Sequence, residues 1–116
     1  MTNAAVDDVK STIEFATLDA VDLRVGEILS AERIPKTDSL LQLQVDVGFE
    51  KRTIVSGIAK FYESSALIGK KVIVVLNLAP RKIRGIESQG MLLAASDGNI
   101  VELPVCQTVK TGSRIS

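Results

Sequence analysis

Alternating hydrophobic and polar residues mark the middle of the chain as β-structure. From 41 to 47 the odd positions hold Leu, Leu, Val and Val, and the even positions hold Gln, Gln and Asp. This period of two predicts a half-buried strand, which Gly48 ends. Similar patterns predict strands over residues 22–34 and 51–56. Within the first of these, Gly26 predicts a bulge or a sharp bend.

The period changes after the third strand. Between residues 58 and 67 the apolar positions have the spacing of a short helix, and Gly69 suits its C-terminal end. Further apolar runs predict strands over 71–78, 89–95 and 100–105.

The two ends of the chain extend beyond this series. Residues 1–12 show no period and are expected to form a flexible lead-in. Phe15 and Leu18 predict one helical turn that packs on the rest of the domain. Asp97-Gly98 predicts a hairpin turn, after which the chain continues as a C-terminal extension.

Three meandering strands, a helix and two more strands follow the order of the five-stranded OB-fold barrel. The predicted fold is therefore all-β with one short helix, a five-stranded OB-fold barrel and a C-terminal extension from about residue 97. With 116 residues the chain can build one core, and we expect a single domain over 13–116. Aromatic residues make up only 3% and Trp is absent, so the core is expected to be aliphatic.

The composition excludes several classes of function. The sequence contains no His, which removes the commonest general base and zinc ligand, and it holds one cysteine, Cys106. We therefore expect no metal, no cofactor and no catalytic activity. No apolar run approaches the ~20 residues of a membrane span, and the acidic start does not resemble a signal peptide. These features favour a cytoplasmic protein.

The net charge is zero, but the charges are unevenly distributed. Residues 51–85 carry eight basic residues and one acidic residue, a net charge of +7, whereas residues 1–50 carry −6. Such asymmetry suggests an anionic partner for one face, and it equally fits a solvated charged surface.

Residues 80–87 are predicted to form a basic loop between the fourth and fifth strands, where OB barrels bind oligonucleotides. Its cations, with the polar residues around them, suit contacts to a nucleic-acid backbone. Each neutral residue also has a structural interpretation, as a turn, strand-edge or core residue. The candidate RNA-binding residues of this region are Asn77, Arg81, Lys82, Arg84, Ser88, Gln89 and Met91.

Lys51 and Arg52 extend the basic region or protect an edge strand, and they complete the candidate RNA-binding set. Phe61 and Tyr62 are expected in the core because of their helical spacing. With so few aromatic residues to stack on bases, the composition favours recognition of a folded RNA by shape and backbone.

Four stretches together carry a specific resemblance: 22–26 (DLRVG), 52–58 (RTIVSGI), 77–82 (NLAPRK) and 85–93, which contains Ser-Gln-Gly-Met. Over residues 15–116 the chain resembles the stand-alone structure-specific tRNA-binding proteins and the C-terminal domain of methionyl-tRNA synthetase. Ser39 departs from the pattern, since many relatives have Lys there, and this removes one possible phosphate contact.

This resemblance implies an OB-fold that binds tRNA by its shape near the elbow. It also implies a homodimer, and it matches Asn77, Lys82, Arg84, Ser88 and Met91 to the tRNA-binding region of the family. The expected function is a non-catalytic tRNA-binding module, free or attached to an aminoacyl-tRNA synthetase such as the methionyl enzyme. The alternative is a CsaA-type export chaperone that binds unfolded polypeptides.

Dimerisation is expected to use the apolar C-terminal extension. A five-stranded barrel needs only about the first 95 residues to close, and the extension is then free to pair. Phe15 and Leu18 are expected to assist this contact.

Overall fold

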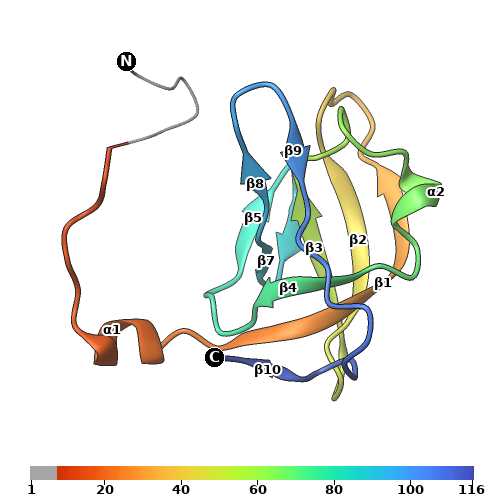
Figure 1. Cartoon of the computed structure of the whole chain (residues 1–116). Coiled ribbons are helices and arrows are strands. Elements are labelled where there is room, and N and C mark those ends of the chain that lie inside the picture. Colours follow the sequence, from red (N-terminus) through yellow and green to blue (C-terminus); the bar gives the residue numbers. More distant parts are fainter. Residues whose placement is uncertain (1–7) are drawn as a thin grey trace.

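The computed structural model describes residues 8–116 and contains a small β-barrel with two short helices (Figure 1). Residues 1–7, part of the predicted lead-in, lie outside the described residues, and residues 8–12 are exposed and form no helix or strand. The elements are α1 (Phe15–Asp19), β1 (Leu23–Arg33), β2 (Leu41–Asp46), β3 (Lys51–Ser56), α2 (Ser64–Leu67), β4 (Lys71–Val75), β5 (Arg81–Ile83), β6 (Ile86–Ser88), β7 (Met91–Leu92), β8 (Ala95–Ser96), β9 (Val101–Glu102) and β10 (Arg114–Ile115).

Five strands form the barrel in the order β3-β2-β1-β4-β7, with every neighbouring pair antiparallel. Hydrogen bonds between Thr53 of β3 and Gln89, just before β7, bring the two ends of this sheet together. The predicted five-stranded OB-type barrel is confirmed. The predicted strands 71–78 and 89–95 are shorter in the structure, because the chain turns away from the sheet at both places.

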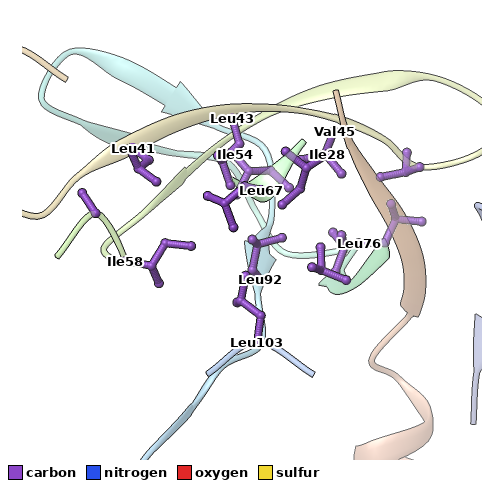
Figure 2. Close-up of a cluster of buried hydrophobic side chains, with 14 residues drawn as sticks. Ile28, Leu41, Leu43, Val45, Ile54, Ile58, Leu67, Leu76, Leu92 and Leu103 are labelled. Atoms are coloured by element: carbon purple, nitrogen blue, oxygen red, sulfur yellow. The ribbon is translucent and has the colours of Figure 1, made fainter. Parts of the chain in front are cut away.

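The barrel is filled by aliphatic side chains, as the composition predicts (Figure 2). In β2 the alternating residues Leu41, Leu43 and Val45 are fully buried, whereas the glutamines between them are not. Leu92 and Leu103 lie on the other side of the same cluster in Figure 2.

Gly26 has a different role from the predicted bulge, which lies instead between Ile28 and Ser30. A Cβ atom at position 26 would lie 2.7 Å from Val45 Cγ1 and 2.7 Å from Val74 Cγ2. Glycine is thus required because two core side chains pack directly on the β1 backbone.

We expect Gly26→Ala to lower the free energy of unfolding by about 1–3 kcal/mol, since overpacking forces core side chains from their rotamers. Urea denaturation measures this loss. Gly57→Ala is the matched control, because an added Cβ there meets nothing within 4 Å. Equal stability of the two variants would contradict the role given to Gly26.

The helix predicted over 58–67 is reduced to α2, a single turn at its end. Ile58 and Leu67 are buried as expected, but Phe61 is 45% exposed, so its predicted place in the core is wrong. Tyr62 packs against the core, and its hydroxyl accepts a hydrogen bond from the Leu103 N–H at 2.9 Å.

The expectation that the first helix packs on the barrel is also wrong. Helix α1 buries no residue, and its Phe15 and Leu18 side chains are 76% and 55% exposed. In Figure 1 the segment that leads into α1 stands clear of the barrel.

The C-terminal extension folds back on its own barrel rather than standing free. Leu103 is 4% exposed within the core, and a bridge joins Val105 to Val72. Strand β10 then pairs with the start of β1. The predicted turn at Asp97-Gly98 joins β8 to β9, and the Asp97 carboxylate accepts hydrogen bonds from two backbone N–H groups, which lower its pKa. The five barrel strands all lie before residue 95, as expected, but Leu103 of the extension is also part of the buried core.

Candidate nucleic-acid interface

The predicted basic loop at 80–87 is a two-stranded hairpin. Strands β5 and β6 pair antiparallel from Arg81↔Ser88 to Ile83↔Ile86. The two residues between the strands, Arg84 and Gly85, have positive φ angles of 53° and 81°. Such angles suit a tight two-residue hairpin turn, whose twist matches that of the strands. The loop prediction is corrected to a regular element, called the basic hairpin below.

Three cations project from the basic hairpin. Arg81, Lys82 and Arg84 are all exposed. Lys82 lies opposite Glu87 in the hairpin register. The structure thus places these cations together on one exposed element, as predicted. Their contact with RNA stays a prediction.

The tip of the hairpin lies against the loop between β1 and β2. Arg84 Nη2 donates a hydrogen bond to the Lys36 carbonyl oxygen at 3.2 Å. Arg33, at the end of β1, donates to the carbonyl oxygens of Asp38 at 3.1 Å and Ala59 at 3.4 Å. One end of the barrel therefore combines cations from two separate parts of the chain, the hairpin and the β1–β2 region.

The sequence analysis did not select Arg33 or Lys36. Both residues are distant in sequence from the hairpin, so no local pattern links them to it. The signal lies in the fold itself, since an OB barrel brings to its binding face the β1–β2 loop and the connection between its fourth and fifth barrel strands, which here are β4 and β7. Lys60 is exposed and follows Ala59, so it belongs to the same end of the barrel.

Ser88 lies under the hairpin rather than on its surface. It is 2% exposed; its Oγ accepts a hydrogen bond from the Val55 N–H at 3.0 Å and donates to the Gly90 carbonyl oxygen at 3.1 Å. The hydroxyl is thus occupied within the protein, where it ties the end of β6 to β3.

Gln89 continues this connection. Its side-chain Oε1 accepts from the Thr53 N–H at 3.0 Å, and its own N–H donates to the Thr53 carbonyl oxygen at 2.8 Å. Two consecutive side chains therefore hold the base of the basic hairpin on β3. Met91, at the start of β7, is 48% exposed and remains available for contact.

We expect Ser88→Ala to lower the free energy of unfolding by about 1–3 kcal/mol, because the buried Val55 N–H is left without its acceptor. Urea denaturation checks this value. Ser65→Ala, at an exposed position of α2, is the matched control. If both variants unfold like the original chain, the Ser88 hydroxyl does not hold the hairpin.

Lys51 and Arg52 differ in their surroundings, although both open β3. Lys51 is exposed. The Arg52 guanidinium is bound internally: Nε lies 2.6 Å from Glu50 Oε2, and Nη1 donates to the Leu76 carbonyl oxygen at 2.5 Å. It also lies over the Phe49 ring, 5.8 Å from its centroid. Arg52 therefore connects β3 to the segment that follows β4.

Asn77 begins the connection from β4 to the basic hairpin. Its amide binds the backbone just before β1: Nδ2 donates to the Ala20 carbonyl oxygen at 2.7 Å, and Oδ1 accepts from the Asp22 N–H at 2.8 Å. Nearby, Arg24 forms an ion pair with Asp22 and keeps the pKa of that carboxyl group below its usual value.

Two hollows flank Asn77. A groove of about 560 Å³ lies between α1 and β10, and its apolar lining includes Phe15, Leu18 and Ile115. A second hollow of about 400 Å³ lies between Arg52 and the 76–80 connection.

The described residues contain no group of three or more Cys, His, Asp or Glu side chains placed to hold a metal ion. Among residues 8–116, no helix is long and apolar enough to cross a membrane.

Comparison with known proteins relates this chain to tRNA-binding domains. Residues 23–114 match the model of the tRNA-binding domain family. A methionine–tRNA ligase of Chloroherpeton thalassium is 53% identical over 91 residues, which are 78% of this chain. The chain spans only 13% of the length of that curated relative.

Solved structures show the same barrel. A protein related to methionyl-tRNA synthetase from Pyrococcus horikoshii has a TM-score of 0.87 and 38% identity, with 92% of this chain and 100% of that chain covered. The chaperone CsaA of Bacillus anthracis has a TM-score of 0.83 and 26% identity, with 91% and 100% covered. The family match spans most of the chain, and the ligase relative is identical at half of the aligned positions. The chain therefore belongs to the tRNA-binding domain family.

Proposed function

We propose that this chain is a non-catalytic module that binds tRNA by its shape and backbone. The observation that carries the proposal is the basic hairpin, which has three exposed cations and contacts the Lys36 loop through Arg84, on the barrel of a tRNA-binding family. Lys and Arg side chains at such a place suit phosphate oxygens, which position a nucleic acid without reading its sequence. Affinity would then come mainly from the backbone charges of the RNA.

The module would serve methionyl-tRNA synthetase, either as a part of the enzyme or as a separate accessory subunit in the cytoplasm. The ligase relative supports the first arrangement, and the Pyrococcus protein, whose solved chain is matched over its whole length, supports the second. In both arrangements the catalysis belongs to another part of the enzyme.

We further propose that two copies pair through α1. Phe15 and Leu18 are exposed on a helix that buries no residue, and with Ile115 they form the apolar part of the groove between α1 and β10. A two-fold axis places the helix of each copy in the groove of the other, so one symmetric contact covers both surfaces. The dimer would present two basic hairpins to one tRNA and raise its avidity.

Filter binding with unfractionated tRNA tests the RNA-binding function. We expect saturable binding of tRNA and no comparable binding of a permanently unfolded polypeptide. The CsaA likeness makes the opposite result meaningful, because preference for the unfolded polypeptide would favour a chaperone. Absence of tRNA binding at low salt would refute the proposed function.

A further inference from the structure

Helix α1 is held in place by hydrogen bonds rather than by packing. It consists of five residues, none of them buried. Between α1 and β1 the backbone of residues 20–22 runs beside the segment after β4. The direction of the helix therefore depends on how this short linker is fixed to the barrel.

Asn77 supplies two of the three hydrogen bonds that join the linker to the segment after β4. Its amide accepts from the Asp22 N–H and donates to the Ala20 carbonyl oxygen, at 2.8 and 2.7 Å. The third bond runs from the Leu76 N–H to the Asp22 carbonyl oxygen at 2.8 Å. One side chain thus binds both the donor and the acceptor of a segment more than 50 residues away.

An amide matches this pair of backbone groups because it carries one acceptor and one donor group side by side. A carboxylate at the same place keeps the bond from Asp22 but turns an oxygen toward the Ala20 carbonyl oxygen. An alanine loses both bonds. The residue type is therefore explained by the linker, without any RNA contact.

We infer that Asn77 is a positioning residue, which orients α1 for pairing with a second copy and supports tRNA binding through assembly rather than by contact. This inference rests on the proposed homodimer. Asn77 also lines the groove between α1 and β10, so the residue that fixes the helix forms part of the surface proposed to receive the partner.

The test compares Asn77→Ala with Asn99→Ala, a matched change at an exposed position between β8 and β9. Sedimentation over a concentration series gives the dimer dissociation constant. We expect it to rise about ten-fold or more for Asn77→Ala, since two hydrogen bonds are lost in each copy. The control variant should dimerise like the original chain.

Measurements of tRNA binding distinguish a positioning role of Asn77 from direct contact of Asn77 with the RNA. Two copies of Asn77→Ala joined in tandem by a flexible linker should recover tRNA affinity to within about two-fold, because linkage replaces the lost association. The tRNA affinity of this tandem protein should depend on salt in the same way as that of a tandem protein in which Asn77 is unchanged. If the variant dimerises normally and the tandem form still binds tRNA weakly, Asn77 contacts the RNA and the inference is wrong.

A double-mutant cycle adds a second criterion. When Phe15 and Leu18 are serine, a further change of Asn77 to alanine should no longer affect dimerisation, because the helix has lost its contact. If Asn77→Ala fails to fold, Asn77→Asp takes its place, since it retains the bond from Asp22. A persistent effect in the cycle, or no effect of either variant on assembly, would overturn the inference. A monomeric original chain that still binds tRNA would refute the dimer and this inference, but not the RNA-binding function.

Discussion

A variant with alanine at both Lys82 and Arg84 is expected to bind tRNA at least about 100-fold more weakly, since two charge-assisted hydrogen bonds of about 1.5–3 kcal/mol each are lost and each 1.4 kcal/mol is ten-fold. Both side chains are exposed on the basic hairpin, so their removal leaves the core intact. Exposed charges add little to stability, and the melting temperature should stay nearly constant. Filter binding and thermal unfolding measure the two quantities.

The salt dependence gives a second readout of the same variant. With three to five cations engaged in each copy, the logarithm of the affinity should fall with the logarithm of salt concentration with a slope of about −2 to −4. Loss of two phosphate contacts should make this slope shallower by about 1.5. Binding that ignores salt would contradict a site built from these cations.

The choice of control follows from the structure. Lys70 and Lys71 lie outside the basic hairpin, but Lys71 is unsuitable as a control because its Nζ donates to the Val109 carbonyl oxygen and holds the C-terminal extension. Lys70→Ala with Lys110→Ala removes the same charge without breaking that bond. If this control weakens tRNA binding more than the hairpin variant does, the interface lies elsewhere on the barrel.

The second large effect is expected from Phe15→Ser combined with Leu18→Ser. Burial of one large apolar side chain contributes about 1.5–3 kcal/mol, and a symmetric contact loses both residues twice. The dimer dissociation constant should therefore rise by about 100-fold or more, even if burial is incomplete. Sedimentation over a concentration series measures it.

Ile100→Ser tests the competing view that the C-terminal extension forms the contact. Ile100 is 64% exposed in the turn between β8 and β9, so serine there should not disturb the fold. We expect this variant to remain dimeric. Dissociation by Ile100→Ser, with no effect of the α1 changes, would move the interface to the extension.

Truncation near Ala95 is a poor test of the same question. It removes Leu103, which is buried in the core, and β10, which pairs with β1. We expect the shortened chain to unfold, and circular dichroism should reveal the loss of strand structure. A folded truncated dimer would show that the extension contributes to neither the core nor the contact.

The local pattern of hydrophobic and polar residues was sufficient to predict the barrel strands. The alternation from 41 to 47 predicts β2, because side chains of a strand point to opposite faces and only one face meets the core. The run from Lys51 to Ser56 and the clustered cations at 81–84 were likewise evident, since each lies within one short segment. The order of these segments then indicates the OB-type fold.

Tertiary structure decided how the candidate residues are used. Ser88 and Gln89 bind β3 more than 30 residues away, Asn77 binds the linker before β1, and Arg84 contacts the Lys36 loop. No local pattern carries these pairings, because a polar residue looks the same in sequence whether it faces solvent or an unpaired backbone group. The sequence determined which strands form and where positive charge gathers. Only the folded chain, by satisfying its buried backbone groups, decided which polar side chains are bound within the protein and which remain exposed.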